Sequence, residues 1–300
     1  MNAVKEIAYA KINLYLDVIS KREDGFHDIK TVMHSVSLAD EITVSVAPSS
    51  KLNIRLITDG ERGVPAYLPT DDNNIAVKAA RAFMDAACLT ANINLKLKKN
   101  IPIAAGLAGG SADAAAVLRA LNKLFRKPFT EKKLMEIAAG IGSDVPFCLM
   151  GKTALCEGRG ERLTKIDISL GMHFVIANSG EYVSTPTAYA LLDKEFSDFK
   201  ESRDDSEGRY ARFYSELKDG SDISNLLYNI FEAPILEKCS GAAKIKKMLE
   251  SYGALGVMLS GSGPSVFAIF ENGQAAKDAA EKVRSEGYFA EYAVSCDLLK

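Results

Sequence analysis

The sequence predicts a two-domain protein that mixes strands and helices, and three observations lead to this prediction. The chain has 300 residues, and domains of about 150 residues are typical. Hydrophobic residues recur at both strand and helix spacings. The chain is 47% hydrophobic and 25% charged, which is ordinary for a globular protein and excludes a disordered or fibrous one. We expect one domain at residues 1–165 and the other at residues 166–300.

The elements of the first half follow from these spacings. Residues 8–18 alternate, so we expect a strand with Ile12, Leu14, Leu16 and Val18 on one face and a wet face carrying Lys11, Asn13, Tyr15 and Asp17. Further strands are expected at residues 42–46 and 92–98. Helices are expected at residues 74–87, 111–125 and 130–139, with Gly140 as a stop and another helix starting near residues 143–146.

The second half has a different pattern. Strands are expected at residues 153–157, 173–177, 255–259 and 266–270, and helices at residues 185–192, 234–250 and 274–284. Thr185 and Pro186 are typical of a cap and a first helical position. Residues 193–222 are densely charged with few apolar residues, which indicates a solvated helix or loop outside the core.

Charge and cysteine content exclude several function classes. The 37 basic and 39 acidic residues give a net charge of −2, which disfavours a nucleic-acid partner but leaves a small anionic ligand open. The five cysteines are scattered without CxxC spacing, so we expect neither disulfides nor a zinc site. The longest uncharged stretch is broken by Ser260–Gly261–Ser262–Gly263–Pro264, which excludes a membrane span there. With no secretory signal at the N-terminus, a cytoplasmic location is expected.

A glycine-rich loop before the helix at residues 111–125 is the most informative segment. It contains Gly106, Gly109, Gly110 and Ser111. Glycine lets the backbone approach a ligand, and the unpaired N–H groups of a helix N-terminus attract phosphate. The alternative is a tight turn packed against a neighbour. The loop lacks the dinucleotide-binding pattern, so a dinucleotide-binding fold is poorly supported. A second segment, residues 151–153, matches the end of a Walker A loop. Because a strand rather than a helix follows Thr153, we judge this match a coincidence.

Two charged residues are candidates for proton transfer. Asp144 lies among apolar neighbours, where a carboxylate needs a partner or a chemical role, although a plain helix N-cap is the simpler alternative. Lys11 projects from the first strand beside Asn13. An ammonium near Asp144 would keep it ionised and polarise a substrate hydroxyl. The alternative for Lys11 is a side chain that extends from a strand edge into water.

Two loops have weaker signals. Residues 24–27 (Asp-Gly-Phe-His) form a turn in which Phe26 is suited to stack on a flat ring and His27 to hydrogen-bond a ligand, unless the segment is only a turn. Residues 260–265 form a second Gly/Ser loop, suited either to line a phosphate or to connect two strands.

Together these segments resemble the GHMP small-molecule kinases, which include galactokinase, homoserine kinase, mevalonate kinase and phosphomevalonate kinase. The resemblance rests on Lys11-Ile12-Asn13-Leu14, on PIAAGLAGGSA at residues 102–112, and on the loop at residues 260–265. AKINLYL, DGFH and GSDVPF are most similar to the branch that phosphorylates the 2-hydroxyl of 4-diphosphocytidyl-2-C-methyl-D-erythritol in the non-mevalonate isoprenoid pathway. The resemblance implies an α+β fold, with an N-terminal ATP-binding domain containing a left-handed βαβ crossover and a C-terminal ferredoxin-like domain.

The resemblance also implies roles for individual residues, with ATP and Mg²⁺ as cofactors and a cytidine diphosphate group on the substrate. Asp144 matches the catalytic base and Lys11 its partner. The residues that match the family's substrate-binding positions are Asn13, Phe26, His27, Thr185 and Tyr189. Phe26 and Tyr189 would sandwich the cytosine ring, and His27 would read its edge. The nucleotide side matches Asn73 and a triphosphate-binding loop. That loop consists of Pro102, Ile103, Ala104, Ala105, Gly106, Leu107, Ala108, Gly109, Gly110, Ser111 and Ala112.

The sequence departs from the family pattern at several positions. Ala104, Ala105 and Ala108 stand where many members have glycine, and alanine permits the same close approach while its φ stays negative. Ala112 replaces a usual second serine, and Phe26 a usual tyrosine. The competing interpretations are a homoserine- or mevalonate-type kinase and, from another class, a non-catalytic nucleotide- or RNA-binding module. The sequence does not predict the oligomeric state or the metal ligands.

Overall fold

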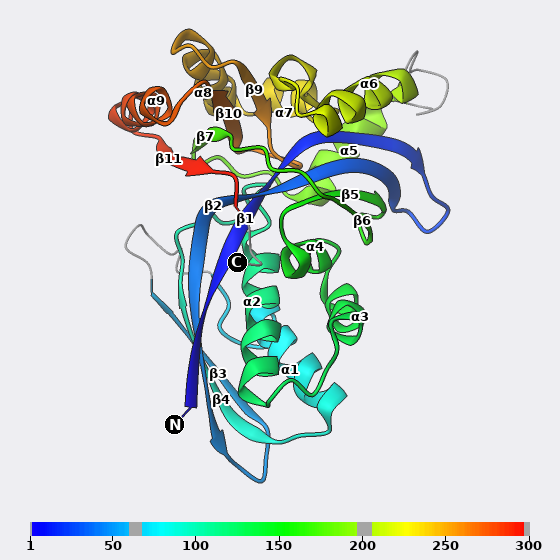
Figure 1. The fold of residues 1–300 in the computed structure, drawn as a ribbon, viewed down its shortest axis with the longest axis vertical. Helices are drawn as coiled ribbons and strands as arrows, with labels where there is room; N and C mark the ends of the chain where they lie inside the picture. Colours follow the sequence, from blue (N-terminus) through cyan, green and yellow to red (C-terminus); the bar gives the residue numbers. More distant parts are fainter. Residues whose placement is uncertain (1, 60–67, 197–205, 297–300) are drawn as a thin grey trace. The chain divides into compact units, whose positions relative to one another are not determined.

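The structure is a computed structural model that describes residues 2–59, 68–196 and 206–296 (Figure 1). Within it the chain forms two compact units. The first unit contains residues 1–10, 39–103 and 108–150, and the second contains residues 11–38, 104–107 and 151–300. The long strands β1 (Asn2–Lys21) and β2 (His27–Pro48) each contribute residues to both units. The expected division into domains at residues 1–165 and 166–300 stays a prediction.

The first unit packs helices against strands. β4 (Ala91–Lys98) pairs in parallel with β3 (Asn53–Asp59) and antiparallel with the second half of β2. Alternate β4 residues are buried, from Ala91 to Leu97, as its hydrophobic period predicts. The helices gather on one side of these strands (Figure 1). They are α1 (Ile75–Ala87), α2 (Gly109–Leu124), α3 (Glu131–Ile141) and α4 (Val145–Met150).

The second unit contains an antiparallel sheet with the strand order β11-β7-β10-β9. Its strands are β7 (His173–Asn178), β9 (Gly256–Leu259), β10 (Val266–Phe270) and β11 (Phe289–Val294). Helices α8 (Ser240–Ser251) and α9 (Gly273–Ser285) pack on this sheet. The order of strands and helices is the ferredoxin-like βαββαβ arrangement that the resemblance implied.

The rest of the second unit lies around the second half of β1 and the first half of β2. There β1 pairs with the short strand β8 (Tyr228–Asn229). β2 pairs with β5 (Thr153–Gly158), which pairs with β6 (Arg162–Ile166). The remaining helices are α5 (Thr185–Glu195), α6 (Ser206–Asp219), the 3₁₀ helix η1 (Ser224–Leu226) and α7 (Glu232–Lys238).

The expected wet face of the first strand is wrong. Lys11, Asn13, Tyr15 and Asp17 are all buried, with at most 4% of each residue exposed. α6 covers the part of this face that carries Tyr15 and Asp17, because Ser206 donates a hydrogen bond to Asp17 and the Tyr15 ring packs on Phe213. The expectation that residues 193–222 lie outside the core is therefore wrong for Phe213 and Leu217, which are fully buried. Residues 197–205 lie outside the described residues.

Several predicted helix ends differ by a few residues. α3 continues past Gly140 to Ile141, so Gly142 rather than Gly140 ends it. Ser184, not Thr185, caps α5, because its hydroxyl accepts the Thr187 N–H. The helix expected at residues 234–250 is two helices that meet at Cys239. None of the described helices is both long enough and apolar enough to cross a bilayer.

Candidate functional site

The glycine-rich loop before α2 is held by β1 and by the loop at residues 260–265. The Lys11 N–H donates to the Leu107 carbonyl at 3.1 Å, and the Ser265 N–H donates to the Ala105 carbonyl at 3.2 Å. Gly106 lies against the second loop so tightly that a Cβ at this position would be 2.1 Å from the Ser260 carbonyl oxygen. Its φ is +79°, so a side chain is excluded by both space and conformation. The two Gly/Ser loops thus form one structure.

Two of the three loop alanines do not keep the negative φ under which alanine permits close approach. Ala104 has a φ of 52° and Ala108 a φ of 54°. Ala108 is the N-cap of α2 and makes no side-chain cap hydrogen bond. Its left-handed conformation turns the chain into the helix two residues before the predicted start. Alanine here adopts a left-handed backbone conformation, which glycine would adopt without strain.

The start of α2 exposes backbone donors. Ala112 is the first residue whose N–H pairs along the helix, with the Ala108 carbonyl at 2.9 Å. Gly109, Gly110 and Ser111 precede it within the helix and, as first-turn residues, have no intrahelical acceptor for their N–H groups. Such donors, at the positive end of the helix dipole, are suited to bind phosphate oxygens.

Lys11 is fixed beside the loop. Its Nζ donates to Asn13 Oδ1 at 2.7 Å and to the Gly106 carbonyl at 2.8 Å. Asn13 in turn donates to Thr31 Oγ1 at 2.8 Å. The Ser260 hydroxyl donates to the same Gly106 carbonyl at 3.0 Å. The structure therefore brings Lys11, Asn13, Gly106 and the second loop together.

Asp144 lies in the first unit, directly before α4. Its carbonyl accepts the Cys148 N–H at 3.0 Å, which is the backbone position of an N-cap. The residue is half-buried. Lys11 belongs to the second unit, so the pairing of its ammonium with the Asp144 carboxylate stays a prediction.

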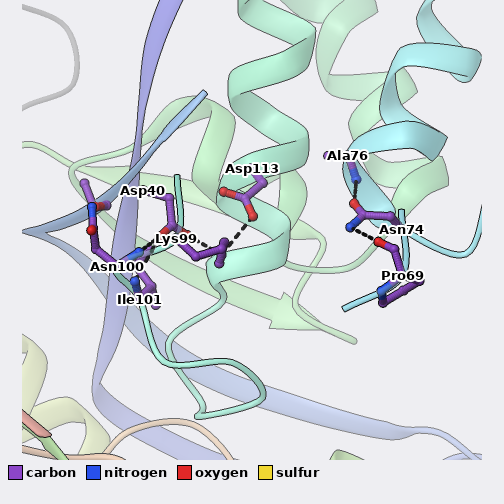
Figure 2. Close-up of polar contacts among 9 residues, drawn as sticks. Asp40, Pro69, Asn74, Ala76, Lys99, Asn100, Ile101 and Asp113 are labelled. Carbon is purple, nitrogen blue, oxygen red and sulfur yellow. Dashed lines mark hydrogen bonds and ion pairs between the residues drawn. The ribbon is translucent and has the colours of Figure 1, made fainter. Parts of the chain in front are cut away.

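Asn73 lies in an exposed turn before α1. Its N–H and its side-chain amide both donate to the Asp71 carboxylate, at 3.0 and 3.2 Å. The sequence analysis missed its neighbour Asn74, which caps α1 by accepting the Ala76 N–H and donates to the Pro69 carbonyl (Figure 2). An asparagine directly before a helical spacing is the signal that identifies such a cap.

A cluster of aromatic and charged side chains lies where β2 begins. The buried ring of His27 stacks on Tyr189 of α5, with centroids 4.6 Å apart. Its Nε2 is 2.8 Å from an oxygen of Asp193. Because a carboxylate only accepts, Nε2 carries a proton and donates it to Asp193. Phe26 is half exposed, with the Arg159 guanidinium 4.1 Å from its ring centroid.

Asp193 is the residue that the sequence analysis missed in this cluster. Lys21 also donates to it, at 2.6 Å. Although partial burial opposes the shift, the hydrogen bonds from Lys21 and His27 hold the pKa of Asp193 below its ordinary value. Its spacing of four residues from Tyr189 was the available signal, because residues four apart share one helix face.

The second loop also contacts α5. Thr185 Oγ1 and Ser262 Oγ lie 3.2 Å apart. Asn229 holds the loop from behind, donating to the Leu259 and Gly261 carbonyls at 2.8 Å each. The sequence analysis missed Asn229, because nothing local marks it.

Two family models match the chain. "GHMP kinases N terminal domain" matches residues 74–152, and "GHMP kinases C terminal" matches residues 210–288. The 4-diphosphocytidyl-2-C-methyl-D-erythritol kinase of Caldicellulosiruptor bescii is 41% identical over 279 residues, covering 92% of this chain and 93% of that protein.

Two solved structures are also similar. A crystal structure of 4-(cytidine 5'-diphospho)-2C-methyl-D-erythritol kinase has a TM-score of 0.80 and 29% identity, covering 98% of this chain and 100% of that one. Homoserine kinase from Cytophaga hutchinsonii has a TM-score of 0.74 and 21% identity, covering 99% of this chain and 95% of that one, which shows a shared fold.

Proposed function

The chain belongs to the GHMP kinases, and from that membership we propose an ATP-dependent kinase. It phosphorylates the 2-hydroxyl of 4-diphosphocytidyl-2-C-methyl-D-erythritol, giving the 2-phosphate and ADP in the non-mevalonate isoprenoid pathway. One observation carries the proposal: the Lys11 ammonium is bonded to the carbonyl of Gly106, in the centre of the loop that would bind the triphosphate. A strand residue predicted to act on the reacting hydroxyl is thereby fixed to the nucleotide loop.

The reaction needs mainly alignment and charge neutralisation. The backbone donors at the start of α2 and the loop at residues 102–108 bind the ATP phosphates. The substrate hydroxyl forms an O–P bond to the γ-phosphorus while the bond from that phosphorus to ADP breaks. Asp144 accepts the hydroxyl proton, and the Lys11 ammonium stabilises the attacking oxygen. Asn13 and Thr185 lie on the substrate side in this proposal.

Mg²⁺ would supply charge neutralisation between the phosphate oxygens. In the part of the chain that the structure describes, no three His, Cys, Asp or Glu side chains form a metal cluster. This fits a Mg²⁺ ion held largely by substrate phosphates and water. Ser111 is the only side-chain hydroxyl in residues 102–112 and is the loop residue that would reach the ion.

The cytidine group would bind at His27. His27, whose Nε2 is bonded to Asp193, would read the edge of the cytosine ring, and Tyr189 and Phe26 provide ring faces. Asn73 is proposed on the nucleotide side. The cytoplasm, a reducing compartment, is the proposed location.

An ADP-release assay with three alcohols tests the function. We expect ADP formation with 4-diphosphocytidyl-2-C-methyl-D-erythritol and none above background with homoserine or mevalonate. Faster turnover of homoserine or mevalonate would favour the competing kinase types. Absence of ADP release with all three would favour a non-catalytic nucleotide-binding protein.

Two matched variants test the cytidine site. Tyr189→Leu should raise the KM for the cytidine substrate about tenfold. The variant loses the ring that stacks on His27 and that would stack on the cytosine. Tyr292→Leu removes the partner of a second stacked pair in the same unit, at His173, and should leave that KM unchanged. Equal effects of the two variants would contradict the placement of the cytidine group.

A further inference from the structure

A buried cluster of three ionisable side chains lies in the first unit, next to the start of the segment at residues 102–108 (Figure 2). Lys99 directly follows β4, and its Nζ donates to Asp40 of β2 and, at 2.9 Å, to Asp113 of α2. At most 7% of each of the three side chains is exposed. Neither the sequence analysis nor the proposed mechanism uses any of them.

Asp40 fixes the chain where it enters the loop. Its Oδ1 accepts the backbone N–H groups of Asn100, at 2.6 Å, and Ile101, at 2.9 Å. The Asn100 side chain donates to the Ala39 carbonyl at 2.8 Å. Three hydrogen bonds therefore hold residues 100–101 to β2.

Asp113 fixes the chain where it leaves the loop. It is the fifth residue of α2, so its bond to Lys99 anchors the first turns of the helix whose N–H groups would face the phosphates. Gly109 makes the close approach possible, because a Cβ there would be 3.0 Å from Ile101 Cγ2 and 3.3 Å from Lys99 Nζ. The two ends of the segment at residues 102–108 are thus joined through one ammonium.

The charges in the cluster depend on one another. Burial raises the pKa of Asp113 to about 8, with repulsion from Asp40 adding to the shift and Lys99 opposing it. Although burial opposes it, attraction by Asp113 and Asp40 holds the pKa of Lys99 above its ordinary value. Among the described residues, none hydrogen-bonds to Asp113 Oδ1. Removing the ammonium would leave two carboxyl groups buried together, so the link between the loop ends would open.

We infer that the Asp40–Lys99–Asp113 cluster is a positioning device for ATP, holding both ends of the phosphate loop so that the α2 N–H groups converge on the phosphates. The inference rests on the proposed function. The three residues act through the backbone of the loop, and their loss should weaken ATP binding without affecting the alcohol site. A merely structural cluster would change stability alone.

The test compares three variants of the cluster with a matched control. Lys99→Met and Asp113→Ala break the link, whereas Asp113→Asn keeps an oxygen that can accept from Lys99. Glu6→Gln weakens another ionic cluster of the same unit, in which Arg119 and the half-exposed Lys123 of α2 donate to the buried Glu6 at 3.1 and 2.6 Å. KM for ATP, KM for the alcohol, kcat and the urea midpoint are measured for each protein.

We expect Lys99→Met and Asp113→Ala to raise the KM for ATP at least tenfold, with kcat and the KM for the alcohol within threefold of wild type. Asp113→Asn should restore the KM for ATP to within threefold. Glu6→Gln should lower the urea midpoint and leave the KM for ATP unchanged. An unchanged KM for ATP in Asp113→Ala, or an equal rise of that KM in Glu6→Gln, would overturn the inference. If Lys99→Met does not fold, the KM values for ATP of Asp113→Ala and Asp113→Asn test the inference.

The inference and the proposed function fail in different ways. If the wild-type protein forms no ADP with the cytidine substrate, the proposed function fails. Calorimetric titration with Mg²⁺ and ATP then compares the wild type with Asp113→Ala directly. Loss of at least tenfold in ATP affinity would still support the positioning role, and equal affinity would refute it.

Discussion

Replacing Ala108 and Ala104 with glycine should stabilise the protein. Both alanines have left-handed φ values, 54° and 52°, and this conformation costs a non-glycine residue about 1–2 kcal/mol. Glycine avoids that cost but gives the unfolded chain extra freedom, which lowers stability by about 0.4–1 kcal/mol. The central values differ by about 0.8 kcal/mol for each site, or about 1.6 kcal/mol for the double variant.

Thermal unfolding in the absence of nucleotide measures this effect. At about 2–4 °C per kcal/mol for a chain of this order of size, the double variant should melt roughly 3–6 °C above wild type. Ala105 is the internal control, because it lies in the same loop, is buried and has no positive φ. Ala105→Gly should therefore lower the melting temperature. A double variant that melts at or below wild type would refute the assignment of strain to these positions.

Three further predictions concern the second unit. Asp193→Asn should raise the KM for the cytidine substrate about three- to tenfold and reduce the enzyme's preference for that substrate over the uridine analogue, because His27 loses its charged acceptor. Steady-state kinetics with both nucleotides measures this preference. An unchanged preference would contradict the prediction. Burial lowers the pKa of His34 from 6.5 to about 4. Between these values the unfolded chain binds a proton at His34 and the folded protein does not, so the free energy of unfolding falls as pH drops from 6.5 toward 4. Urea titrations across that range should show a flatter pH dependence for His34→Gln, and a curve parallel to wild type would exclude His34 as the cause. Gly106→Ala should lose at least about 3 kcal/mol of stability or fail to fold, because the new methyl group would meet the Ser260 carbonyl at 2.1 Å in a left-handed conformation; normal melting of this variant would show that the loops do not pack as described.

Local signals predicted most of the helices and the central strands. The helical spacing at residues 74–87 matches α1, and the alternation at residues 92–98 matches β4. Strands β9 and β10 around the second Gly/Ser loop were also predicted, because uncharged runs bounded by Ser, Gly and Pro are a strong local pattern. Strand β3, which pairs with β4, was missed, as were β6, β8 and β11.

Long-range packing explains the features that the sequence did not reveal. Alternation placed Tyr15 and Asp17 on one face of β1 correctly, but the nature of that face depends on α6, which is nearly 200 residues away. The Asp40–Lys99–Asp113 cluster likewise joins three elements that are far apart in the chain. Pattern reasoning identifies which side chains share a face, and only the fold determines what covers them.

The conformations of the loop alanines were missed for another reason. Sequence patterns treat left-handed backbone as a property of glycine, because alanine rarely adopts it. At Ala104 and Ala108 the loop geometry overrides that preference. Strain of this kind is found where the surrounding structure fixes the backbone, and loops that bind ligands are frequent examples.

The rate of phosphoryl transfer in Asp144→Asn tests the proposed chemistry most directly. A single-turnover experiment with saturating ATP and 4-diphosphocytidyl-2-C-methyl-D-erythritol should show a rate about 10²- to 10⁴-fold below wild type, because the proton acceptor is lost. ATP affinity and melting temperature should be unchanged, and Asp85→Asn, at an exposed carboxylate of the same unit, should react at the wild-type rate. A near-normal rate in Asp144→Asn would contradict the account.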